Sequence, residues 1–111
     1  MRYVLLICGD ENLAPGPEHE DEEPMTDWFA EMNGRGVRQT SVRLRTTGTA
    51  TTVRSADSGE VLLSDGPFAE TKEQILGFEL IECADLDEAL EIAGKHPSAR
   101  YGPIEVRPVW E

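Results

Sequence analysis

The residues with the clearest chemical potential lie in one short segment, residues 65–74. It brings together carboxylates at Asp65 and Glu70 and a hydroxyl at Thr71. Its opening Asp-Gly-Pro favours a turn, because proline fixes φ and glycine permits positive φ. Phe68 is expected to be buried and to anchor the loop. Anchored loops at the end of a sheet commonly carry ligand-binding groups, so this segment predicts a site.

Asp65 is the first candidate for a general base, since a partly desolvated carboxylate can accept a proton. The alternative is structural, with the Asp65 side chain accepting hydrogen bonds from the backbone amides of residues 67–68. Glu70, Thr71 and Phe68 have the same two interpretations. They line a substrate site, or they only stabilise the loop, by hydrogen bonds to its backbone amides or by packing.

The two histidines are the remaining candidates for proton transfer. His96 precedes Pro97 and ends a predicted helix, where a cation interacts favourably with the helix dipole. A catalytic pair of His96 with Asp65 is the functional alternative. His19 lies in the acidic run of residues 18–23 and reaches the site only if that loop folds over it.

Two arginines are candidate anchors for an anionic group of a substrate. Arg45 ends a polar strand and Arg100 lies in the loop before the last strand. A guanidinium can bind a carboxylate through two parallel hydrogen bonds, although exposed strand arginines are commonly only solvated. The chain has no phosphate-binding loop, zinc-ligand spacing, nucleophile elbow or dinucleotide fingerprint, so no metal and no cofactor are predicted.

Composition narrows the class of protein. The 111 residues carry a net charge of −12, which opposes binding to nucleic acid. No run of 18 apolar residues can span a membrane, and the apolar start is too short for a signal peptide. We therefore expect a cytoplasmic protein with a single domain over residues 1–111. Cys8 and Cys83 are expected to act as small buried apolar residues.

The hydrophobic pattern predicts the elements that position these groups. Residues 3–8 form a central strand, apolar on both faces, and residues 9–24 form an acidic surface loop, a candidate lid. Thr26 is predicted to cap a helix over residues 27–33, and Asp85 one that ends near Lys95. The second helix is expected to bury Leu86, Ala89, Leu90 and Ala93. The other strands are predicted at residues 36–45, 51–54, 60–63, 77–83 and 104–109.

This order, strand, helix, strand, hairpin, strand, helix, strand, predicts an α+β sandwich of the ferredoxin-like type. Both helices are expected on one face of an antiparallel sheet. The other face then exposes apolar strand residues, and two copies packed face to face would bury them. The pattern therefore predicts a homodimer.

The chain also resembles a known family. The segments that carry the likeness are DGPFAETKEQ at 65–74, GFELIE at 77–82, LDEAL at 86–90, His96-Pro97 and IEVRPV at 104–109. They are similar to the DGPF subgroup of the YCII-related proteins, which are bacterial. The resemblance implies a ferredoxin-like domain that pairs into a dimeric α+β barrel with a cleft in each half.

The resemblance also implies a function. YCII-related proteins are thought to be enzymes with a shared His and Asp, and Asp65 matches the Asp. The family's His lies in the first helix, where this chain has none, so only His19 or His96 can replace it. We expect a cofactor-independent lyase or isomerase that acts on a small polar or anionic molecule. The alternative is a noncatalytic binding or regulatory module, since DGPF-like domains are associated with sigma-factor systems.

Overall fold

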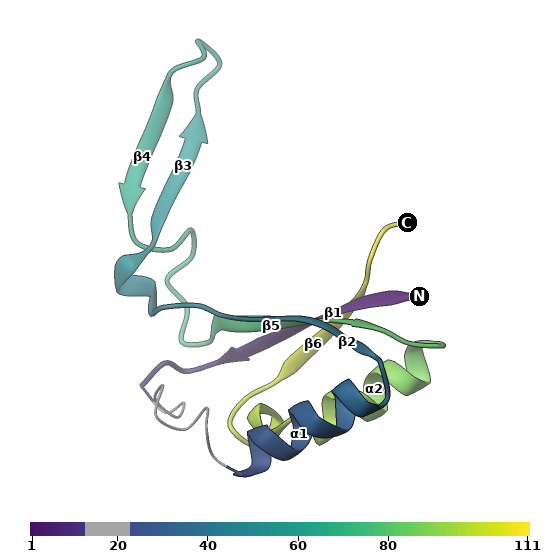
Figure 1. Ribbon diagram of the computed structural model, residues 1–111. Helices are drawn as coiled ribbons and strands as arrows, with labels where there is room; N and C mark the ends of the chain where they lie inside the picture. The colour runs from purple at the N-terminus through teal and green to yellow at the C-terminus, as the bar shows by residue number, and fades with distance from the viewer. Residues whose placement is uncertain (13–22) are drawn as a thin grey trace.

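The computed structural model describes residues 1–12 and 23–111, and it has the predicted order of elements (Figure 1). Six strands and two helices lie along these residues, with short 3-10 turns at Thr47–Thr49 and Pro97–Arg100. The strands are β1 (Arg2–Gly9), β2 (Arg38–Arg43), β3 (Thr51–Ser55), β4 (Val61–Asp65), β5 (Gln74–Glu82) and β6 (Ile104–Pro108), and the helices are α1 (Glu23–Gly34) and α2 (Leu86–Lys95).

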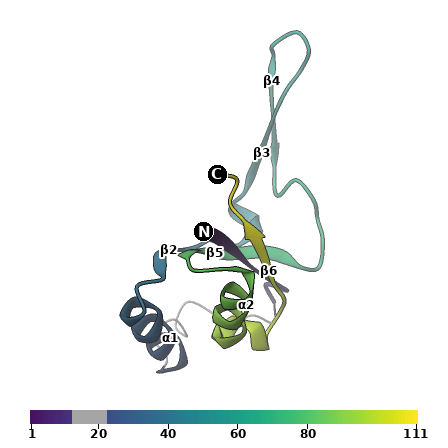
Figure 2. The same ribbon diagram turned by 90° about the vertical axis from the view of Figure 1, so that its right-hand side faces the viewer.

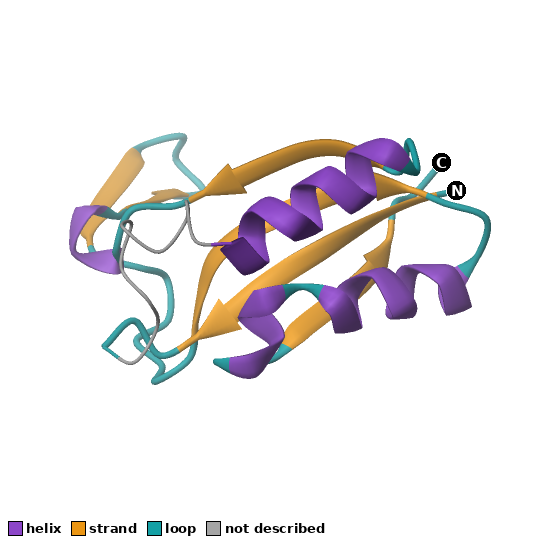
Figure 3. Ribbon diagram, turned by 60° about the horizontal axis from the view of Figure 1, so that its bottom comes forward, coloured by secondary structure: helices purple, strands orange, loops and turns teal. Residues whose placement is uncertain are grey.

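Four of the strands form one antiparallel sheet in the order β2-β5-β1-β6. Both helices cover the same face of this sheet, as Figures 2 and 3 show. The predicted α+β class is confirmed, and this strand order is that of a ferredoxin-like fold. Strands β3 and β4 pair only with each other and form a separate hairpin, also as predicted.

The core lies between the sheet and the helices, and β1 shows why. Its residues alternate between the two faces, and Tyr3, Leu5 and Ile7 are buried while the residues between them are only half-buried. The strand is central, as predicted, but the expectation that both its faces are covered is wrong. Helices pack on one face only, so the apolar residues of the other face stay partly exposed.

The first helix is longer than predicted. It begins at Glu23, so Thr26 lies inside the helix and is not its cap. Pro24 sits in the first turn, where a missing backbone N–H costs nothing and the fixed φ suits a helix. The prediction treated this proline as part of the preceding loop. Trp28 and Met32 are buried on the face toward the sheet.

The second helix begins as predicted, because the Asp85 side chain accepts a hydrogen bond of 2.9 Å from the Glu88 amide. Its buried stripe differs from the prediction. The buried residues are Ala89, Ile92 and Ala93, whereas Leu86 and Leu90 are 46% and 49% exposed. The helix is therefore rotated from the expected orientation, so that Ile92 faces inward in place of Leu90.

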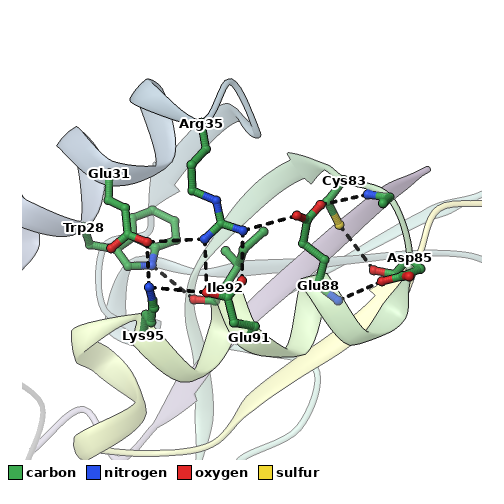
Figure 4. A network of polar contacts seen from close by, with 10 residues as sticks. Trp28, Glu31, Arg35, Cys83, Asp85, Glu88, Glu91, Ile92 and Lys95 are labelled. Atoms are coloured by element: carbon green, nitrogen blue, oxygen red, sulfur yellow. Dashed lines mark hydrogen bonds and ion pairs between the residues drawn. The ribbon is translucent and has the colours of Figure 1, made fainter.

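A cluster of ion pairs joins the two helices on their solvent side (Figure 4). Arg35 after α1 contacts Glu88 and Glu91 of α2 at 3.3 and 2.9 Å, and Lys95 contacts Glu31 at 2.8 Å. Hydrogen bonding to Lys95 lowers the pKa of Glu31, and hydrogen bonding to Arg35 lowers the pKa of Glu91. The Arg35 guanidinium is therefore engaged between the two helices.

Candidate functional site

A cleft lies beside the 65–74 segment, at the end of the sheet where β1 finishes and β5 begins. Its cavity has a volume of about 470 Å³, within the range of small-molecule pockets. Three parts of the chain form the described wall: the turn after β1, the 3-10 turn at Thr47–Thr49, and the 65–74 segment. The residues are Asp10, Glu11, Asn12, Thr47, Gly48, Gly66, Pro67, Glu70, Thr71, Lys72 and Gln74.

Local hydrogen bonds shape the 65–74 segment. Gly66 has φ of 94°, as its turn requires, and its amide donates to the Ala50 carbonyl at 2.8 Å. Gln74 then closes the loop, since its Nε2 donates to the Ala69 and Thr71 carbonyl oxygens at 2.9 Å each. These bonds place Glu70 and Thr71 in the cleft wall, where the sequence predicted binding groups.

Phe68 does not anchor the loop, and the prediction that it is buried is wrong. It is 76% exposed. The segment follows a hairpin that stands away from the sheet, so no core lies within reach of this ring. The Arg54 guanidinium lies 5.0 Å from the ring centre, a cation–π contact on the surface. Phe68 is also not among the described residues of the cleft wall.

Carboxylates outnumber cations in the cleft wall. Glu11 is occupied, because both its oxygens accept a hydrogen bond from the Thr47 amide at 3.1 Å. Asp10 Oδ1 accepts from the Asn12 amide at 2.9 Å. Within residues 1–12 and 23–111, the Glu70 carboxylate and the Lys72 ammonium have no hydrogen-bond partner. These two groups are therefore free to contact a ligand.

His96 belongs to a different part of the molecule, a chain of buried and partly buried polar groups. Its Nε2 lies 3.2 Å from Glu79 Oε1, and the two residues are 3% and 5% exposed. The other Glu79 oxygen accepts a short hydrogen bond from Ser41 Oγ. Arg38 Nε in turn donates to that Ser41 oxygen at 2.7 Å.

The backbone fixes the protonation of the His96 ring. The Ser98 amide donates to Nδ1 at 3.1 Å, so the ring proton lies on Nε2 and is donated to Glu79. The ring also packs edge-on against Trp28, with the ring centres 4.6 Å apart. Both ring nitrogens are occupied, and Asp65 is not a contact. The predicted catalytic pair of His96 with Asp65 is therefore absent from the structure, because His96 follows α2 with its ring in the core.

The remaining predicted residues do not gather at the cleft. Asp65 is exposed at the end of β4, immediately before the cleft residue Gly66, and its carboxylate accepts no hydrogen bond within residues 1–12 and 23–111. Arg45 and Arg100 are exposed and are not among the described residues of the wall. His19 and most of the predicted acidic lid lie outside the described residues.

Sequence reasoning missed half of the cleft wall and the buried pair. Asp10, Glu11 and Asn12 follow directly after a buried strand, a position that often carries binding groups, and this signal was available. Thr47 had no such signal. Glu79 was treated as an ordinary strand residue, yet it alternates with the buried Ile81 and therefore had to face the core.

The described residues hold no group of three or more His, Cys, Asp or Glu side chains placed to bind a metal ion. Burial raises the pKa of both thiols, at Cys8 and at Cys83. Neither cysteine is disulfide-bonded. No helix in the described part of the chain is long and apolar enough to cross a membrane.

The chain is similar in sequence to known proteins. The sequence model of the YCII-related domain matches residues 1–111. The chain is also 43% identical over 115 aligned positions to the uncharacterized protein R00369 of Rhizobium meliloti (strain 1021), and the match covers 98% of this chain and 92% of that protein. The protein belongs to the YCII-related family.

Proposed function

We propose that the protein binds a small polar organic molecule in the cleft beside the 65–74 segment. The observation that supports this proposal is a cavity of about 470 Å³ whose wall includes Glu70 and Thr71. A wall contributed by three separate parts of the chain is typical of a ligand site.

The free groups of the wall define the kind of ligand. Glu70 offers a carboxylate and Lys72 an ammonium, so a ligand with both a hydrogen-bond donor and an acceptor can satisfy both. Three carboxylates and one ammonium line the described wall. This balance favours a neutral or cationic molecule over the anionic one that the arginines suggested.

Proton transfer is a second candidate function. Glu70 lines the cavity with no hydrogen-bond partner in the described residues, and Asp65 stands beside Gly66 of the same wall. Either carboxylate can act as a base on a bound molecule, as a cofactor-independent lyase or isomerase requires. His96 has no part in this candidate, because Glu79 and the Ser98 amide occupy its ring.

A panel of polar metabolites tests binding by the rise in melting temperature that a ligand causes. We expect at least one compound to stabilise the parent protein and to lose its effect in Glu70→Gln or Lys72→Met. Glu73→Gln is the matched control, since Glu73 lies in the same loop but is not among the described wall residues. A compound that stabilises all four proteins equally would show that it binds elsewhere.

Turnover of the same compound distinguishes the second candidate. The catalytic proposal predicts that Asp65→Asn or Glu70→Gln abolishes turnover of a compound that the parent protein converts. Turnover that is unchanged in both variants would exclude proton transfer by these two carboxylates.

A further inference from the structure

The cleft wall presents two opposite charges that do not pair with each other. Glu70 and Lys72 both line the cavity and lie two residues apart in the chain. Within the described part of the chain, neither side chain forms an ion pair or a hydrogen bond. The chain's other lysine, Lys95, pairs with Glu31 and Glu91. Because the sequence has 22 acidic and only 10 basic side chains, an ammonium without a carboxylate partner is unexpected.

The neutral side chains of the loop are used to hold its backbone. Gln74 Nε2 donates to the Ala69 and Thr71 carbonyl oxygens at 2.9 Å each, which fixes the backbone before and after Glu70. The Thr71 hydroxyl donates to a backbone carbonyl oxygen two residues further on. The loop thus spends its amide and hydroxyl groups on its own structure, and Glu70 and Lys72 are the wall residues whose polar groups it leaves for a ligand.

The other two carboxylates of the described wall are already engaged. Both Glu11 oxygens accept a hydrogen bond from the Thr47 amide, and Asp10 Oδ1 accepts one from the Asn12 amide. Their negative charges still contribute to the potential in the cleft, which attracts a cation and repels a free anion. A ligand ammonium therefore has its best position at Glu70.

A ligand with only one kind of charge cannot satisfy both groups. An amine would meet Glu70 but bring a like charge into the cavity of Lys72, and an anion would meet Lys72 against three carboxylates. A neutral molecule would displace water from both charges and offer weaker hydrogen bonds in return, because bonds between ionised partners are the stronger ones. A zwitterion meets each charge with its opposite and adds no net charge to the cleft.

We propose that the ligand of the cleft is a zwitterionic amino acid, with its ammonium at Glu70 and its carboxylate at Lys72. This inference rests on the proposed function and narrows the polar ligand to one chemical class. The cavity of about 470 Å³ leaves room for more than the two charged groups. The rest of the ligand lies against Gly48, Gly66 and Pro67, the uncharged residues of the wall.

Titrations followed by the amide shifts of the ¹⁵N-labelled full chain test this proposal, because they report both affinity and position. The probes are the standard amino acids and the ω-amino acids from β-alanine to 6-aminohexanoate. The tightest binder is then compared with its N-acetyl derivative, which lacks the ammonium, and with its carboxamide, which lacks the carboxylate. We expect each derivative to bind about tenfold more weakly, the scale of one hydrogen bond between charged groups.

Substitutions in the wall assign each contact separately. Glu70→Gln should weaken binding of the amino acid and of its carboxamide about tenfold, but not that of the N-acetyl derivative. Lys72→Met should weaken binding of the amino acid and of the N-acetyl derivative, but not that of the carboxamide. Glu73→Gln is the matched control and should change none of the three. Circular dichroism should show all variants folded, because these side chains are exposed.

The outcomes separate this proposal from the proposed function. If other polar compounds shift the amides of the wall but no amino acid does, the zwitterion is overturned and the ligand site stands. Derivatives that bind as tightly as the amino acid itself, or variants that weaken all three ligands alike, also overturn the zwitterion. If no compound of either panel shifts the amides of the wall, both proposals fail.

Discussion

The buried contact between His96 and Glu79 should contribute strongly to the stability of the folded protein. Replacing His96 with Phe keeps an aromatic ring against Trp28 but removes the Nε2 donor, so the Glu79 carboxylate stays buried with only its Ser41 partner. Leaving a buried acceptor without its hydrogen-bond donor costs about 1–3 kcal/mol, and more when the acceptor is charged. The ring also caps the next turn through the Ser98 amide, and loss of a cap costs about 1 kcal/mol.

We therefore expect His96→Phe to lower the free energy of unfolding by about 2–4 kcal/mol, a large part of the 5–15 kcal/mol of an ordinary domain. Urea denaturation followed by circular dichroism measures this. Glu79→Leu in the same background should recover about 2 kcal/mol, because it removes the unpaired carboxylate. A single-variant loss below about 1 kcal/mol, or losses that add in the double variant, would refute the reasoning.

Three further predictions concern local structure. A Cβ at Gly77 would lie 2.5 Å from the Val42 carbonyl oxygen of the neighbouring strand, so Gly77→Ala should cost about 1–3 kcal/mol in urea denaturation. In contrast, a Cβ at Gly94 in α2 meets open space, so Gly94→Ala should raise the free energy of unfolding by about 0.5–1 kcal/mol. Equal effects of the two substitutions on stability would contradict the close pairing of β2 with β5 at Gly77. Asp85→Ala should cost about 0.5–2 kcal/mol through its lost cap, and no change would contradict that hydrogen bond. The hydrogen bond from Arg35 lowers the pKa of Glu91 from its ordinary value of 4.5. The Arg35–Glu91 pair therefore stabilises the folded protein fully above pH 4.5, and this stabilisation is lost as the pH falls through the lowered pKa of Glu91 in the folded state. The urea midpoint of Arg35→Gln should thus fall below that of the parent at neutral pH and converge with it in acid; a gap independent of pH would exclude this cause.

Periodicity and capping residues were sufficient to predict most of the fold. The apolar run of β1, the Asp85 cap and the turn of the hairpin are local signals, and each predicted the correct element. The rotation of α2 was not predictable, because Leu90 and Ile92 are equally apolar and only packing against the sheet decides which is buried. The early start of α1 at Glu23 was missed because a proline in a first turn resembles a loop.

The candidate site was predicted only in part, for a similar reason. Glu70 and Thr71 follow a turn with a strong local signal, and they do line the cleft. Thr47 comes from a part of the chain far from them in sequence, and only the fold brings it to the same wall. The prediction that Phe68 is buried was wrong because a large apolar residue is buried only where a core is within reach. Phe68 follows the β3–β4 hairpin, which stands away from the core, and its ring is exposed.

The central claim is that the cleft beside the 65–74 segment is a ligand site, and its most direct test is an NMR titration of the ¹⁵N-labelled protein with the stabilising compound. We predict amide shifts concentrated at Gly48, Gly66, Thr71 and Lys72, which line the described wall, with little change in α1 or α2. Shifts confined to the helices or to the β3–β4 hairpin, or no shifts at a saturating concentration, would contradict the claim.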